Sequence, residues 1–500
     1  MLGDLLAGFV RALSFSNLGF LLFGGTLGTI LGMLPGLGPA TGVAVLLPLT
    51  FILPPDTAMI TLAGIYYGAM YGGSRSSILI NTPGDGAAIA ATFDGYPMTE
   101  KGEAESALAM AAIASFIGGI IAVILMAFLS KPIANFAIKF GSGEMFALMI
   151  FAFSATVSIT RGSPLKGLMS LMFGLMISTV GQDLQTGVFR YTFGMTSLQS
   201  GVDFLIVIIG VYAMGEVLYN FELIHIAVKK VQKTFGRIWV TMDQFKRCII
   251  PIILRSTPIG FIIGVLPGSG GTLGSLVAYN TEKQINKNGD QFGKGAIEGV
   301  AAPEAANNAA ATGALIPLLT LGIPGSGTTA VMLGALMMLG LKPGPLLFEQ
   351  QSGVVWALIA SMIIGNLLLA IINLPFAEIL VRVLAVPKKI LFTLIIGLAF
   401  LGTYTFNYNI FDLYILIVFG IIGYLMKKFD MPITPMILAV IIGGKTENIF
   451  RRALQISRGN IGIFFDSWIS IILWGLAILS ASYPFVISYF KNKKESSKES

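Results

Sequence analysis

Two apolar stretches of the chain are interrupted by nearly the same phrase, GMLPGLGPATG at residues 32–42 and GVLPGSGGTLG at residues 264–274. Glycine and proline make up more than half of the first phrase. Membrane helices tolerate such residues where neighbouring protein groups satisfy the backbone groups that a break sets free. A second pair follows, because AMYGGSRSSILINTPGDG at 69–86 aligns without gaps on AATGALIPLLTLGIPGSG at 310–327. Each half of the chain therefore carries two Pro-Gly breaks in the same order.

The composition around these breaks is that of a membrane protein. Of the 500 residues, 55% are hydrophobic and 11% are charged, whereas about 25% of the residues of an average soluble protein are charged. Long apolar runs recur along the chain, which predicts an all-α polytopic membrane protein. We interpret its two related halves as inverted repeats, with broken helices or re-entrant hairpins at the Pro-Gly motifs. The single cysteine, Cys248, excludes an internal disulfide.

A polar segment at residues 221–247 divides the chain and is rich in lysine and arginine. The positive-inside rule places this linker in the cytoplasm. We therefore expect an N-terminal transmembrane repeat at 1–220, a C-terminal transmembrane repeat at 248–490 and a disordered polar tail at 491–500. The net charge of +7 fits basic cytoplasmic loops, and no segment predicts nucleic-acid binding.

The breaks predict a binding site. A helix broken within the membrane exposes N–H groups at one new end, which attract anions, and C=O groups at the other, which can coordinate a cation. Interrupted segments at corresponding positions of two halves point to a transporter binding site. The alternative is that the breaks only permit kinks and close packing, which fits one break better than four paired ones. The predicted carboxylate-binding residues are Gly36, Gly38, Thr41, Thr82, Gly84, Gly268, Ser269, Gly270, Thr272, Gly325, Ser326 and Thr328.

Polar residues inside apolar segments are candidates for the coupling ion. Asn307 and Asn308 follow Glu304 in a segment of small residues, and Asn81 occupies a comparable place in the first half. Intramembrane polar residues are functional by default, and amide oxygens suit Na⁺, so we predict an ion site at Asn81, Asn307 and Asn308. Hydrogen bonding between helices is the alternative. Glu304 can cap its helix or carry a proton, and no cofactor besides the coupling ion, Na⁺ or H⁺, is expected.

For the charged residues near the breaks, the sequence favours a substrate-binding role less clearly. Arg75 and Arg255 can each pair with a substrate carboxylate, and can equally reach an interface or an acidic neighbour. Glu216 ends an apolar run, which favours a structural role. An intramembrane transferase would need a cluster of acids or histidines, and the chain has one histidine, His225. We therefore predict a transporter and not an enzyme, with a passive channel for organic anions as the alternative.

Long stretches of this sequence, including the Pro-Gly breaks, resemble the large membrane subunit of the tripartite tricarboxylate transporters, the TctA-type family. The densest parts include YGGSRSSILINTPGDGAA at 71–88, GFIIGVLPGSGGTLGSLVAYNTEKQINK at 260–287 and LKPGPLLF at 341–348. At the position of Arg75 the family pattern more usually has a small polar residue.

The resemblance implies a multi-pass permease of the bacterial inner membrane that imports organic carboxylates such as citrate. It implies symport driven by an ion gradient, and by analogy with other carboxylate carriers an elevator-like form of alternating access. The implied partners are a small membrane subunit (TctB-type) and an extracytoplasmic solute-binding protein (TctC-type) that delivers the substrate.

Overall fold

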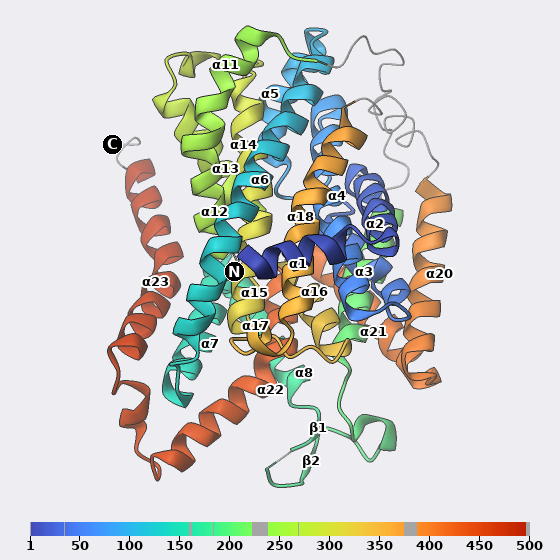
Figure 1. Cartoon of the computed structure of the whole chain (residues 1–500). Coiled ribbons are helices and arrows are strands. Elements are labelled where there is room, and N and C mark those ends of the chain that lie inside the picture. Colours follow the sequence, from blue (N-terminus) through green and yellow to red (C-terminus); the bar gives the residue numbers. More distant parts are fainter. Residues whose placement is uncertain are drawn as a thin grey trace.

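The computed structural model describes residues 2–34, 36–159, 163–183, 185–222, 239–268, 270–374 and 388–496. These residues are mostly helical, and a two-stranded antiparallel hairpin of β1 (Gly181–Gln182) and β2 (Phe189–Arg190) projects at the lower end of the molecule in Figure 1. Eight of the described helices are long and apolar enough to cross a membrane. The prediction of an all-α polytopic membrane protein is thus confirmed.

The α-helices are α1 (Leu2–Ala12), α2 (Phe15–Met33), α3 (Pro39–Leu46), α4 (Pro55–Ile80), α5 (Ile89–Glu100), α6 (Ala104–Ala137), α7 (Ser142–Ile159), α8 (Pro164–Ser178), α9 (Phe204–Ile208), α10 (Gly215–Glu222), α11 (Met242–Ile250), α12 (Thr257–Val265), α13 (Gly270–Ile285), α14 (Glu298–Gly313), α15 (Leu315–Leu321), α16 (Gly327–Met338), α17 (Leu347–Gln350), α18 (Ser352–Asn373), α20 (Lys388–Asn407), α21 (Ile410–Lys428), α22 (Ile433–Ile456) and α23 (Trp468–Ser496). Two π-helical segments join neighbours into longer spans, η3 (Ile209–Met214) between α9 and α10 and η4 (Pro251–Ser256) between α11 and α12. Short 3₁₀ helices are η1 (Leu47–Thr50), η2 (Thr196–Leu198), η5 (Gly289–Gln291) and η6 (Ile461–Phe464).

Two helices form the centre of the molecule. Every residue of α4 from Thr57 to Ile80 is buried, and so is every residue of α14. A helix that is covered on all sides belongs to the core of a large protein. α2 packs along α4, while α6, α12 and α13 pack along α14. The two central helices belong to different halves of the sequence.

Two glycine pairs, each with its members one turn apart, make the same close approach in both halves. The distances from an added Cβ atom to the facing carbonyl oxygen are 2.2 Å for Gly28 to Ile65, 2.2 Å for Gly32 to Ala69, 2.1 Å for Gly260 to Ala306 and 2.3 Å for Gly264 to Ala310. The glycines correspond under the alignment of the first breaks, and the facing residues correspond under that of the second. α2 therefore lies on α4 as α12 lies on α14, which the repeat in the sequence leads one to expect.

The helices pack into two groups that cut across the halves of the chain. The first group, which we term the tip-bearing bundle, contains the four Pro-Gly breaks and comprises α1 to α6 and α11 to α18. The second group, the flanking bundle, comprises α7 to α10 and α20 to α23, where α7 packs on α23, α8 on α22 and α10 on α21. Each half thus gives its earlier helices to one bundle and its later helices to the other.

The domains expected from the sequence are segments of chain, and the two bundles are groups of helices in space. Halves 1–220 and 248–490 are segments of chain whose helices are shared between two bundles, because their apolar faces find partners across the halves. Of the predicted linker 221–247, residues 223–238 lie outside the described residues, and α11 begins within its last part. Of the tail that we expected to be disordered, 491–496 continue α23, and 497–500 lie outside the described residues.

A buried carboxylate ties the two halves together inside the tip-bearing bundle. Asp94 of α5 accepts hydrogen bonds from the backbone N–H groups of Gly293, Gly295 and Ala296 through Oδ1, each at 2.8 Å. Its Oδ2 accepts the hydroxyl of Tyr279 at 2.9 Å. Because a buried carboxylate needs such donors, Asp94 fixes the loop before α14 against the first half.

We expect Gly32→Ala to destabilise the protein by about 1–3 kcal/mol, because the added methyl group meets a backbone carbonyl that cannot turn aside. The measurement is thermal unfolding of the purified protein in detergent. Gly397→Ala in α20 is the matched control, since a Cβ atom there meets nothing within 4 Å. Equal melting temperatures for the two variants would contradict the packing described above.

Candidate functional site

A cavity of about 440 Å³ lies between the tip-bearing and the flanking bundle. The tip-bearing bundle lines it with residues of its Pro-Gly breaks, and the flanking bundle with Tyr212, Glu216, Lys427 and Thr434. A larger cavity of about 660 Å³ among α7, α8 and α22 is lined mainly by apolar side chains. The smaller cavity therefore offers the groups that a polar ligand needs.

The first break of each half turns at a glycine. Gly36 and Gly268 correspond in the alignment and have φ values of +86° and +81°, a left-handed conformation that glycine adopts without steric cost. α2 ends and α3 begins around Gly36, and α12 ends and α13 begins around Gly268. The N–H of Gly268 donates to the carbonyl oxygen of Gly325 at 3.0 Å, so the two breaks of the second half touch.

The second breaks are also alike. Asn81 caps the C-terminal end of α4 with φ +54°, and the aligned Gly322 caps α15 with φ +69°. Left-handed caps of this kind favour glycine and, next, asparagine. After each Pro-Gly pair a side chain caps the following segment, because Asp85 and the aligned Ser326 each accept the N–H three residues later, at 3.1 and 3.2 Å.

Four helices begin at this one cavity. Pro39, Ile89, Gly270 and Gly327 are the first residues of α3, α5, α13 and α16, and all four line the cavity. The first N–H groups of a helix have no partner within it, and the aligned peptide dipoles make that end partly positive. The ends of four helices thus favour negative charge in the cavity.

Most of the predicted carboxylate-binding residues meet at this cavity. Those that line it are Gly36, Gly38, Thr41, Gly84, Gly268, Gly270, Thr272, Ser326 and Thr328. Gly325 lies next to the lining and accepts the hydrogen bond from Gly268. Thr82 is exposed beyond α4 and donates to the carbonyl oxygen of Ile80 at 3.2 Å, outside the lining. Ser269 lies outside the described residues.

The predicted ion-binding residues lie in different places. Asn81 is exposed at the end of α4 and serves there as the helix cap. Asn307 and Asn308 are buried in α14. Asn307 lies directly behind the cavity, since a Cβ atom on the lining residue Gly271 would lie 2.7 Å from its Oδ1. Both polar atoms of Asn307 and Oδ1 of Asn308 have no hydrogen-bond partner among the described residues.

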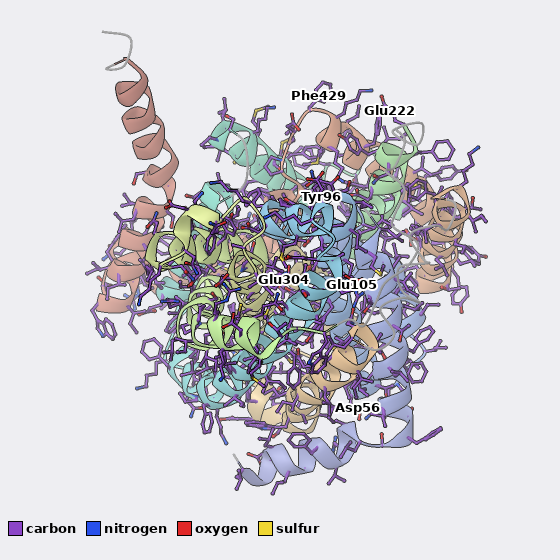
Figure 2. The ribbon with its side chains drawn as sticks, turned by 90° about the horizontal axis from the view of Figure 1, so that it is seen from above. Asp56, Tyr96, Glu105, Glu222, Glu304 and Phe429 are labelled. Atoms are coloured by element: carbon purple, nitrogen blue, oxygen red, sulfur yellow. The ribbon has the colours of Figure 1, made fainter. Side chains whose placement is uncertain are left out.

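Glu304 lies one turn before these asparagines, near the middle of the molecule in the view from above in Figure 2. Its Oε2 accepts hydrogen bonds from the hydroxyls of Ser74 at 2.6 Å and Ser115 at 3.2 Å. Its Oε1 has no partner among the described residues. α14 therefore presents several polar oxygens that the surrounding described residues leave unpaired.

The charged residues of the lining were not among the predicted binding residues, and Glu216 was expected to have a structural role. They are Asp85, Glu216 and Lys427, and Tyr66, Tyr212 and Thr434 add hydroxyls. Glu216 and Lys427 lie close to the ends of apolar runs, where a charge commonly marks only the membrane surface. The one feature of the sequence that could have pointed to a charged lining residue was the position of Asp85 within a Pro-Gly break.

Neither arginine that the sequence singled out lines the cavity. Arg75 is buried and donates from Nε to Oδ1 of Asn373 at 2.8 Å. Arg255 forms an ion pair with Glu282, with Nε and Oε2 2.8 Å apart. Both side chains therefore hold neighbouring helices together.

Comparisons with known proteins give one family and two relatives. The sequence model of the tripartite tricarboxylate transporter TctA family matches residues 18–438. The chain is 43% identical over 494 residues to a protein of Agrobacterium vitis named "Uncharacterized 52.8 kDa protein in TAR-I ttuC' 3'region", covering 98% of this chain and 97% of that one. It is 45% identical over 220 residues to a second Agrobacterium vitis protein, "Uncharacterized protein in TAR-II ttuC' 3'region", covering 44% of this chain and 91% of that one. No solved structure matches the chain.

The contact between the two halves at the cavity is testable by cross-linking. A Cβ atom on Gly86 would lie 3.6 Å from Cβ of Thr272, within the range that disulfides adopt. We expect the double variant Gly86→Cys/Thr272→Cys to form a disulfide under mild oxidation.

The measurement uses a protease site inserted within 223–238, so that cleavage separates the halves. On a non-reducing gel the cut halves of the double variant should stay joined and should separate with reductant. The two single-cysteine variants, which retain Cys248, are the controls. Separate halves in the oxidised double variant would show that the two breaks do not meet.

Proposed function

The chain belongs to the tripartite tricarboxylate transporter TctA family, a family of multi-pass membrane transporters, and from this premise we propose that it is an ion-gradient-driven permease. Its substrates are organic carboxylates such as citrate, delivered by a soluble binding protein. The observation that carries this proposal is the start of four helices at one cavity between the two bundles. Helix N-termini hold carboxylates without the cost of a fixed buried charge.

The charges around the cavity support coupling to a cation. Among the described residues that line it, the charged ones are Asp85, Glu216 and Lys427, two acids and one base. Substrate carboxylates add further negative charge to this lining. A cation that enters with the substrate offsets that charge, which makes symport with Na⁺ or H⁺ the favoured mode.

We place the coupling ion beside α14. The amide oxygens of Asn307 and Asn308 lack partners among the described residues. That of Asn307 lies directly behind Gly271 of the lining. Hard oxygen ligands of this type suit Na⁺. Glu304, one turn away, is the group that would carry a proton in the H⁺-coupled alternative.

Transport proceeds by alternating access, with the two bundles moving against each other around the cavity. The repeated packing of α2 on α4 and of α12 on α14 supports a pair of related halves, and we propose that they are inverted in the membrane. An elevator-like movement of the tip-bearing bundle is the form that we favour, because that bundle holds all four breaks.

The proposed setting is the inner membrane of a bacterial cell, with the basic linker at 221–247 in the cytoplasm. The proposed partners are a small membrane subunit and an extracytoplasmic solute-binding protein. Figure 2 labels Glu222, the last residue of α10 and part of this linker segment, near Phe429, which follows α21.

Uptake into proteoliposomes tests the proposed function. Vesicles that contain this chain and its small membrane partner are given labelled citrate, succinate or benzoate, with and without the binding protein, under separate Na⁺ and H⁺ gradients. We expect uptake that requires the binding protein and one of the gradients. Uptake that ignores both would favour a passive channel, and uptake of none of the acids by a folded complex would refute carboxylate transport.

The ion site has its own test in the same vesicles. We expect Asn307→Ala to raise the ion concentration for half-maximal uptake about tenfold, since about 1.4 kcal/mol of ion binding is lost with one oxygen ligand. Asn366→Ala is the control, because Asn366 already accepts from Tyr71 at 3.3 Å and donates to the carbonyl oxygen of Met362 at 2.9 Å. An equal ion dependence of the two variants would remove Asn307 from the ion site.

A further inference from the structure

One ion pair of the flanking bundle faces the cavity. The ammonium group of Lys427, near the end of α21, contacts the carboxylate of Glu216 in α10. The Lys427 side chain keeps 28% of its surface exposed, while the Glu216 side chain keeps 5%. Both residues line the cavity, so the pair lies at its wall, with Lys427 the more exposed of the two side chains.

Lys427 is the sole cation among the described residues of the lining. Its ammonium group also lies 5.2 Å from the centre of the Tyr219 ring, which confines it on a second side. The neighbouring Lys428 points elsewhere, to Glu222 at 3.0 Å and to the hydroxyl of Tyr424 at 2.9 Å. One of two adjacent lysines is thus directed into the cavity.

The pair also connects the two bundles. Oε1 of Glu216 accepts a hydrogen bond from Nδ2 of Asn220 at 2.7 Å. A Cβ atom on Gly36 would lie 2.8 Å from Oδ1 of Asn220 and 3.1 Å from Oε1 of Glu216. The first Pro-Gly break of the tip-bearing bundle therefore rests against the carboxylate that neutralises Lys427.

We propose that Lys427 binds a carboxylate of the transported substrate, and that Glu216 takes the place of that carboxylate while the cavity is empty. This inference rests on the proposed function and names the residue that selects for a carboxylate. A lysine ammonium has three donors, and its bonds to carboxylates are among the stronger hydrogen bonds of proteins. When the substrate binds Lys427, Glu216 keeps its hydrogen bond from Asn220 and loses the ion pair.

Competition between the two carboxylates distinguishes this role from a structural one. A purely structural ion pair would be weakened alike by loss of either partner. If Glu216 instead competes with the substrate carboxylate for the ammonium group of Lys427, its removal strengthens substrate binding. The two single variants are therefore expected to change the substrate KM in opposite directions.

The experiment measures KM for citrate uptake in the proteoliposomes described above, or for whichever acid of that panel the wild-type protein transports. We expect Lys427→Met to raise KM roughly tenfold to hundredfold, as loss of a charge-assisted bond implies. Lys427→Arg should recover part of this loss. Glu216→Gln should lower KM several-fold, and Lys428→Met, the matched control, should leave it unchanged.

The double variant Glu216→Gln/Lys427→Met guards against misfolding, since it leaves no buried charge without its partner. It should fold and retain the raised KM. A wild-type KM in the double variant, or a raised KM in Glu216→Gln, would overturn the assignment of Lys427. Absence of carboxylate uptake by the wild-type complex would instead refute the proposed function, so the two failures are distinct.

Discussion

The fold depends on the need of every backbone N–H and C=O group for a partner where water is scarce. Each of the four helix breaks frees several such groups, and the chain satisfies them locally. Asn81 and Gly322 close the ends of α4 and α15, Asp85 and Ser326 cap the segments that follow, and Gly268 bonds to Gly325. The other N–H groups in the first turns of α3, α5, α13 and α16 remain, and these helices begin at residues that line the cavity. These N–H groups lie together at the cavity. The same helix breaks that leave backbone groups without partners therefore also form the binding site.

The sequence predicted those parts of the fold and the site that local backbone geometry dictates. A glycine at Gly36 or Gly268 is required by a left-handed turn, and such a requirement is visible in a single repeated phrase. Lys427 and Glu216 could not be found in this way, because their place at the cavity depends on the packing of α10 against α21, more than 200 positions apart in the chain. The structural role of Asn81 was not visible for a related reason. A polar residue at a break resembles a ligand, and its φ value in the folded chain shows that it also caps a helix.

The division into two bundles explains why the halves of the sequence are not the working units of the molecule. Each half carries one α-helical pair held by glycines against backbone carbonyls, and these pairs join through α6, α14 and Asp94 into one packed group. The later helices of both halves form the group that faces it across the cavity. A movement between the groups would leave the four breaks together and would shift the wall formed by Glu216 and Lys427. Such a movement would therefore change the position of Glu216 and Lys427 relative to the breaks without changing the geometry of the breaks themselves.

The pairing within the flanking bundle has a consequence for biogenesis. α7 packs on α23, α8 on α22 and α10 on α21. Each of these early helices is therefore synthesised well before the late helix that it packs against. During that interval the faces of α7, α8 and α10 that later contact these partners are still without them, whereas α2 and α4 can already join as a hairpin. Contacts between such distant segments form slowly. Assembly of the first half in the bilayer is thus completed only when the end of the chain emerges, which makes the C-terminal helices the last step of insertion as well as of synthesis.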